Sequence, residues 1–180
     1  MRWLGKAAAI VLAAAVAAAA GPALAAERGV YLVDNQGLEI RVATVAIEGE
    51  TYRVDWDDAK FGDYFLSMRP FKCLEGPEKL WCRVPYPYEI RRNLAGGDLT
   101  DLEYDLMFIW KRAGEYGINM WNGVYYQLED TGAAYEGVLH EMDMDLLSAP
   151  PDAGVLRPIG EYDTEAGEPE SHWLPRVIVR

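Results

Sequence analysis

Alternating hydrophobic and polar positions near the start of the chain predict consecutive antiparallel strands. Leu38, Ile40 and Val42 alternate with charged residues, and a period of two is typical of a strand with one buried face. The segment Asn35-Gln36-Gly37 carries the residues of a hairpin turn. We therefore expect strands at residues 30–33, 38–47 and 51–56.

Residues 98–112 have the period of an amphipathic helix instead. Leu102 and Leu106 belong to a stripe of apolar residues three and four positions apart, and Thr100 and Glu103 have the spacing of a capping box. We expect this helix to pack one face against the sheet.

Strand signals return in the last third of the chain. Residues 124–128 and 135–147 are expected to be strands, with a turn at Asp130-Thr131-Gly132 between them. The composition then shifts towards Pro, Gly and acidic residues, which favours a loosely ordered segment over 159–171. Residues 173–179 are apolar enough to form a last strand or a docking tail.

These elements predict the α+β class, a mainly antiparallel sheet with one packed amphipathic helix; a small closed β-barrel is the alternative. The predicted organisation has three parts. They are a signal peptide at 1–25, a single globular domain at 26–160, and an acidic tail with a possible last strand at 161–180.

Residues 1–25 have the composition of a cleavable secretory signal. Arg2 and Lys6 precede the unbroken apolar run 7–20, and residues 23–25 read Ala-Leu-Ala, a small-x-small cleavage site. The sequence therefore predicts export to the periplasm.

Charge narrows the range of partners. Two of the 17 basic residues and none of the 29 acidic ones lie in the signal, so the remainder has a formal net charge of −14. Such a field repels nucleic acid and anionic lipid. No second apolar run reaches the length of a membrane span. We expect a soluble protein with an envelope protein or glycan as partner, with neither nucleic-acid binding nor stable membrane insertion.

The two cysteines predict a structural disulfide. Cys73 and Cys82 lie on the two sides of a turn at Glu75-Gly-Pro-Glu78, so they can face each other across a hairpin. An exported chain with one cysteine pair is expected to oxidise it. Neither cysteine has the Cys-x-x-Cys spacing typical of redox motifs.

Four segments in the middle of the chain have distinctive sequences: residues 65–74, 85–88, 98–105 and 139–145. Together they resemble an uncharacterised family of exported proteobacterial proteins. The resemblance covers roughly residues 60–160 and implies export from a bacterial cell. It implies no activity, cofactor or catalytic residue.

One candidate metal site lies in the last predicted long strand. His140, Met142 and Met144 are spaced so that all three would project from one face of a strand. Imidazole and thioether groups are ligands for Cu(I). The same alternation also describes an apolar face turned towards a core, which is the simpler interpretation, and no cofactor is predicted.

The segment between Trp81 and Arg92 is the candidate binding loop. Its prolines hold their neighbours rigidly, which lowers the entropy cost of binding. Trp81, Tyr86 and Tyr88, together with Trp121, could form an aromatic platform for glycan or peptide, and Arg91 and Arg92 could hold an anionic group. Alternatively, these aromatic residues pack the hairpin against the helix.

No catalytic residues are predicted. No serine lies in Gly-x-Ser-x-Gly, and His172 lies in the acidic tail, where we expect it to be solvated. The leading hypothesis is a non-enzymatic periplasmic binding or accessory protein that uses the aromatic, Pro-rich loop. The alternatives are a carboxylate-based hydrolase of envelope glycan and a copper-handling protein.

Overall fold

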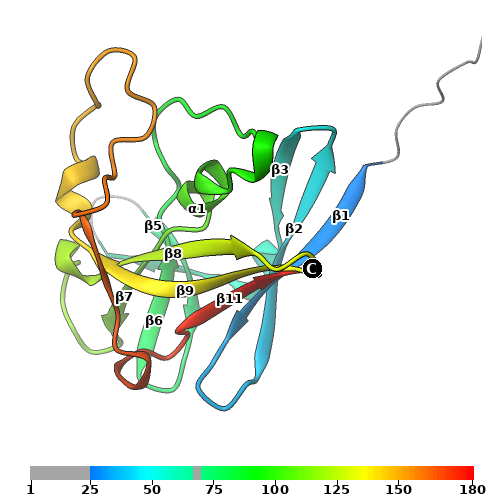
Figure 1. Ribbon diagram of the computed structural model, residues 1–180. Coiled ribbons are helices and arrows are strands. Elements are labelled where there is room, and N and C mark those ends of the chain that lie inside the picture. The colour runs from blue at the N-terminus through cyan, green and yellow to red at the C-terminus, as the bar shows by residue number, and fades with distance from the viewer. Residues whose placement is uncertain (1–24, 67–69) are drawn as a thin grey trace, which may run out of the picture.

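The computed structural model describes residues 25–66 and 70–180, so the predicted signal peptide lies, apart from Ala25, outside the described residues. The framework of the described part is one antiparallel sheet of eleven strands (Figure 1). In chain order the strands are β1 (Ala26–Val33), β2 (Glu39–Glu48), β3 (Thr51–Trp56), β4 (Gly62–Phe65), β5 (Pro70–Glu75), β6 (Lys79–Arg83), β7 (Phe108–Arg112), β8 (Gly123–Asp130), β9 (Tyr135–Met142), β10 (Thr164–Ala166) and β11 (Arg176–Val179).

Helical structure is sparse in the same residues. The single α-helix of the described chain is α1 (Thr100–Asp105), and the other helical turns are short 3₁₀ segments. These are η1 (Asp58–Lys60), η2 (Ala95–Gly97), η3 (Met120–Asn122), η4 (Met144–Leu147) and η5 (Pro169–Ser171).

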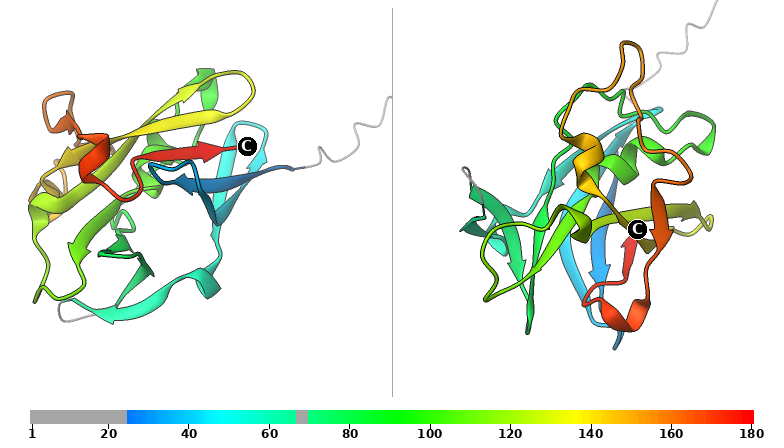
Figure 2. Two further views of the ribbon diagram at one scale, coloured as in Figure 1. Left: turned by 90° about the horizontal axis from the view of Figure 1, so that it is seen from below. Right: turned by 90° about the vertical axis from the view of Figure 1, so that its left-hand side faces the viewer.

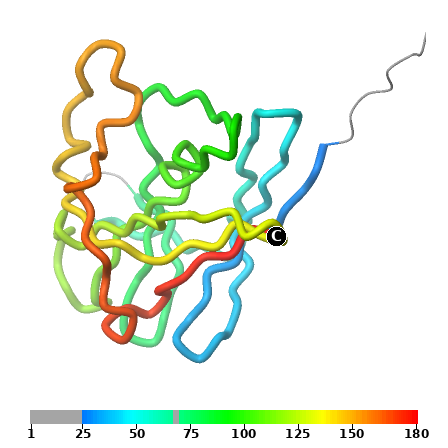
Figure 3. The backbone as a smooth tube through the Cα atoms, viewed as in Figure 1, coloured from blue at the N-terminus to red at the C-terminus, as the bar shows by residue number. Residues whose placement is uncertain are grey.

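The order of the strands brings both ends of the described chain into the middle of the sheet. The strands run β3-β2-β1-β11-β9-β8-β7-β6-β5-β4, and β10 pairs separately with β9. The last strand, β11, therefore lies between β1 and β9, which Figure 3 shows as red beside blue and yellow tube. The C-terminal residues are thus part of the framework.

The predicted hairpins near the start of the chain are confirmed. β1 and β2 pair across a turn in which the Asp34 carboxylate accepts hydrogen bonds from the backbone N–H groups of Gln36 (2.9 Å) and Leu38 (2.8 Å). Gly37 has a φ of 84°, a conformation that favours glycine. β3 then pairs with β2. β2 and β3 lie within one residue of their predicted bounds, whereas β1 begins at Ala26, four residues before its predicted start.

Two hydrophobic cores form because successive side chains of a strand point to opposite faces of the sheet. Leu74 and Trp81 belong to the first core, whereas their neighbours Cys73 and Cys82 belong to the second. The sheet is strongly curled (Figure 2). The second core includes side chains from the irregular segments, such as Tyr86.

The predicted helix over residues 98–112 is largely wrong. α1 ends at Asp105, and Phe108–Arg112 forms β7, which pairs with both β6 and β8. Phe108 and Ile109 are buried on opposite faces of that strand, in the first and second core respectively. A short apolar run such as Phe-Ile-Trp fits either a buried strand or a helix, so the period alone could not separate them.

The alternative of a closed β-barrel is also wrong. β3 and β4 are the two ends of the sheet, and no ladder among the described residues pairs them. The chain between these strands turns through η1. Phe61 packs edge-on against Trp56 (5.8 Å between ring centroids), and the Arg83 guanidinium lies 4.1 Å from the centre of the Trp56 ring. Side-chain packing, rather than a backbone ladder, therefore links β3 to the chain after η1 and to β6.

Within the described residues, none of the helices has both the length and the apolar character needed to cross a membrane.

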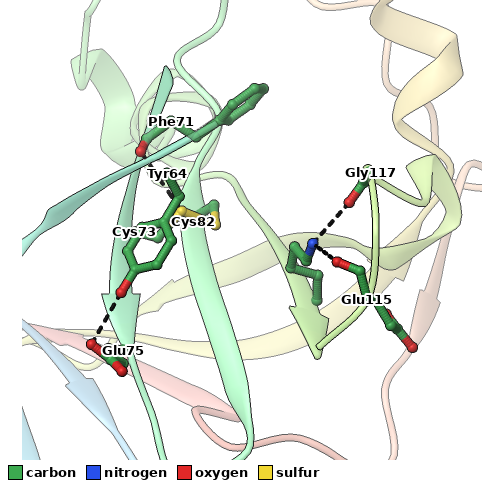
Figure 4. Close-up of a disulfide and its surroundings, with 8 residues drawn as sticks. Tyr64, Phe71, Cys73, Glu75, Cys82, Glu115 and Gly117 are labelled. Atoms are coloured by element: carbon green, nitrogen blue, oxygen red, sulfur yellow. Dashed lines mark hydrogen bonds between the residues drawn. A yellow bond between two sulfur atoms is a disulfide. The ribbon is translucent and has the colours of Figure 1, made fainter. Parts of the chain in front are cut away.

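The predicted disulfide is confirmed. Cys73 and Cys82 are direct partners in the β5–β6 ladder, with 3.9 Å between their Cα atoms, and their sulfur atoms are bonded. Both are fully buried in the second core. Figure 4 shows the bond beside Tyr64, whose hydroxyl donates to Glu75 (3.0 Å). The hairpin is thus closed by turn, ladder and covalent bond together.

Reducing this disulfide is expected to lower the free energy of unfolding by about 2.5–3 kcal/mol, because it closes a loop of roughly ten residues. Urea unfolding with and without dithiothreitol measures the loss. The double variant Cys73→Ala/Cys82→Ala is the control, because its unfolding midpoint should not respond to the reductant. An unchanged midpoint for the reduced native protein would show that the bond adds no stability.

Candidate functional site

The structure anchors the predicted Pro-rich contact loop firmly to the rest of the molecule. The Tyr86 hydroxyl donates to the carbonyl of Leu156 (3.0 Å), and the Tyr88 hydroxyl donates to the carbonyl of Leu147 (3.2 Å). The Tyr86 ring is buried and packs edge-on against Tyr104, with 4.7 Å between the ring centroids. Burial raises the pKa of Tyr86, so its hydroxyl stays protonated and can donate.

The predicted contact residues do not form one surface. Trp81 is fully buried in the first core, so it cannot contact a partner. Tyr86 and Tyr88 pack against each other, with ring centroids 5.6 Å apart, and only Tyr88 is half-exposed. Arg91 is exposed. Most of the aromatic side chains in this segment are therefore packed in the interior and not exposed to a partner.

Arg92 is exposed, but its guanidinium already forms a salt bridge within the protein. Its guanidinium holds both carboxylate oxygens of Asp105, at 2.9 and 3.0 Å, and its φ of 52° is the one positive value among the described non-glycine residues. Tyr52 donates to the same carboxylate (2.9 Å). Burial and the Asp105 charge raise the pKa of Tyr52. Arg92 therefore positions the loop against α1 and is not free to bind an anion.

An apolar cavity of about 300 Å³ lies beside the Pro-rich loop. Pro85 and Pro87 are exposed at this site, while Met144 and Ile109 are buried. Its volume is at the lower end of the range of small-ligand sites. We call it the apolar cavity, and its lining residues are Phe71, Val84, Pro85, Pro87, Tyr88, Ile109, Ile118, Met120, Met144, Leu147 and Ser148.

Sequence reasoning found the Pro-rich side of this cavity and missed the rest. Ile118 and Met120 are contributed by the segment leading into η3, and Leu147 and Ser148 by the end of η4. These segments lie 30 to 60 positions from the loop in sequence. The available sequence signal was that Ile118 and Met120 are apolar residues two positions apart, and this spacing is too common to identify a site.

The candidate copper ligands lie in different environments. β9 ends at Met142, so the strand expected to align the three residues does not reach Met144, which lies in η4. Met142 and Met144 are buried in the second core. His140 is half-buried, with Nδ1 3.3 Å from the carbonyl oxygen of Val138. The copper site stays a prediction, with two of its residues packed among apolar neighbours.

His172 corrects the expectation of a solvated tail histidine. It is only 3% exposed, and its Nε2 lies 2.7 Å from Oε1 of Glu141. Trp81 and Trp110 pack edge-on against its ring, with centroids at 6.3 and 6.0 Å. Burial lowers the pKa of His172, and Glu141 opposes this shift. The local acidic sequence could not show this, because the residues around the ring, on β6, β7 and β9, are far from His172 in sequence.

No family model, curated protein or solved structure matches this chain. The interpretation of function therefore rests on the residues and their geometry.

Proposed function

We propose that the protein is a binding or accessory protein of the bacterial cell envelope, which holds an apolar group of its partner in the apolar cavity. The observation that carries the proposal is the position of the cavity beside the Pro-rich loop. Five separate segments of the chain line it, and the described lining contains no charged side chain. A concave, mostly apolar site with few polar groups is typical of sites that bind small ligands or apolar groups.

The rigidity of the loop supports this proposal. Proline fixes one backbone dihedral angle of Pro85 and Pro87, and the hydroxyl bonds of Tyr86 and Tyr88 hold the segment on its neighbours. A site ordered before its ligand arrives loses less conformational entropy on binding. Location in the envelope is proposed from the signal-like sequence of residues 1–25 and agrees with a disulfide, since disulfides persist in oxidising compartments.

The neutral apolar dye N-phenyl-1-naphthylamine tests the site. We expect saturable binding to the native protein, followed as an increase in dye fluorescence. Ile118→Trp should weaken binding at least tenfold, because the larger side chain would occupy the cavity. Val138→Trp is the matched control, since Val138 is 55% exposed on β9 and does not line the cavity.

Thermal unfolding of both variants distinguishes a filled cavity from a damaged fold. The proposal would be overturned if the native protein bound no dye in a saturable way. Equal dye affinities for folded Ile118→Trp and Val138→Trp would overturn it as well.

A further inference from the structure

A second cavity, of about 460 Å³, lies where β9 ends and the chain enters η4. In Figure 1 this corner is at the left, where the yellow end of β9 lies near η3, η4 and the orange segment that includes β10. We call it the acidic cavity. Its lining residues are Trp121, Glu141, Met142, Asp143, Leu146, Tyr162, Asp163 and Glu165.

Its charge is of one sign. Four of its eight lining residues are acidic and none is basic. Asp143 and Asp163 accept hydrogen bonds from backbone N–H groups, those of Asp145 (2.9 Å) and Gly160 (2.7 Å). Within residues 25–66 and 70–180, no lysine or arginine forms a salt bridge with any of the four carboxylates. No described basic side chain lines the cavity to offset these four carboxylates.

Two of these carboxylates are direct partners in the sheet. Glu141 on β9 and Glu165 on β10 are opposite each other in the antiparallel ladder. Like charges in this arrangement destabilise a strand pair. A cation between them would convert this repulsion into attraction, so the register of the ladder independently favours a positively charged ligand.

Exposed apolar side chains gather at the same cavity. Trp121 is 71% exposed, Tyr162 is 94% exposed and Leu146 is 40% exposed. A Trp or Tyr ring attracts a cation over its face, and the attraction is stronger when the cation is desolvated. Acidic and aromatic side chains around one cavity suit a ligand that is both positively charged and partly apolar.

A buried histidine contacts one of the carboxylates that line the cavity. His172 is 3% exposed, its Nε2 lies 2.7 Å from the Glu141 carboxylate, and its Nδ1 has no hydrogen-bond partner. With the proton on Nε2, the ring donates to Glu141 and leaves the carboxylate its charge. His172 therefore orients a carboxylate of the cavity without neutralising it.

The arrangement of the acidic groups favours an organic cation over a metal ion. In the described part of the chain, no three His, Cys, Asp or Glu side chains are grouped closely enough to hold a metal ion. The carboxylates are instead distributed around a cavity large enough for several non-hydrogen atoms. A ligand with separated amino groups on an apolar chain can reach more than one of them.

We propose that the acidic cavity binds an organic ammonium group, which lies between Glu141 and Glu165 while its apolar part contacts Trp121 and Tyr162. The group could belong to a free polyamine or to a lysine side chain of a peptide, because both present the same chemistry. The acidic cavity and the apolar cavity have no lining residue in common, and this site does not depend on the proposed function.

Isothermal titration calorimetry at low salt tests the proposal with three probes: spermidine, acetyl-Lys-Lys-Lys-amide and the neutral glycan chitotriose. We expect saturable binding of spermidine or the lysine peptide, weakening as salt screens the charges. Spermidine alone would identify a free amine as ligand, and the peptide alone would identify a lysine side chain. Binding of chitotriose alone would overturn the proposal in favour of a glycan site.

Substitutions of lining residues test whether the cationic probe binds in the acidic cavity. Glu165→Gln and Trp121→Ala should each weaken the binding of the cationic probe at least fivefold. Glu136→Gln and Tyr116→Ala are the matched controls, since both residues are exposed and do not line the cavity. Ile118→Trp should leave this binding unchanged, which separates it from the apolar cavity. Failure of both cationic probes to bind, or equal affinities in the folded variants and their controls, would overturn the proposal.

Discussion

A protein that ends at Pro175 is expected not to fold, because removal of residues 176–180 takes β11 out of the middle of the sheet. β11 pairs with β1 through Val30–Val33 and with β9 through Tyr135–Val138. Without it, two strands lose their shared neighbour and expose unpaired backbone groups that are costly to leave unsatisfied. Circular dichroism in the far ultraviolet and thermal unfolding measure the loss.

The apolar side chains of β11 add to the effect. Val177 and Val179 are fully buried in the first core, and full burial of such a side chain contributes about 1.5–3 kcal/mol. Val177→Ala is the milder test and should lower stability by part of that amount while retaining the fold. A truncated protein that unfolded cooperatively at the native temperature would show that β11 is a dispensable tail.

The contrast between the hairpins and β11 explains how much of the fold could be predicted. The β1–β2 and β8–β9 hairpins are encoded locally, by alternation on either side of Asn35-Gln36-Gly37 and Asp130-Thr131-Gly132. Local sequence does not say which distant strands become neighbours. The insertion of β11 depends on pairing with β9, 38 to 44 positions away, and with β1, 143 to 149 positions away. The sequence therefore suggested a last strand without its place.

The same limit applies to the candidate sites. Composition and proline content pointed to the loop around Pro85 and Pro87, which lines the apolar cavity. They could not show that Trp81 is buried while Trp121 is 71% exposed, because exposure depends on the face of the sheet and on what covers it. The burial of His172 against Glu141 likewise joins residues 31 positions apart. Such contacts arise only after the strands have assembled.

Replacing Glu103 by alanine is expected to cost about 2–6 kcal/mol of unfolding free energy, because two buried donors lose their acceptor and each unsatisfied group costs roughly 1–3 kcal/mol. The Glu103 carboxylate on α1 accepts from the backbone N–H of Leu128 (2.7 Å) and from the hydroxyl of Tyr125. Both partners lie on β8, so this side chain fastens the helix to the sheet. Glu103 itself is 7% exposed. Urea unfolding measures the loss.

The conservative variant and the pH dependence separate this hydrogen-bonding role from loss of packing. Burial raises the pKa of Glu103 above its usual 4.5, opposed by the bonds from Tyr125 and Leu128. Since the folded pKa is the higher one, the contribution of Glu103 is fully present below the unfolded pKa and declines as the pH rises through the folded value. Glu103→Gln should cost less than Glu103→Ala, because its amide oxygen can still accept from Leu128, and it should remove this decline above about pH 4.5. Equal losses for the two variants, with the decline retained in both, would show that Glu103 is not the acceptor that holds α1 on β8.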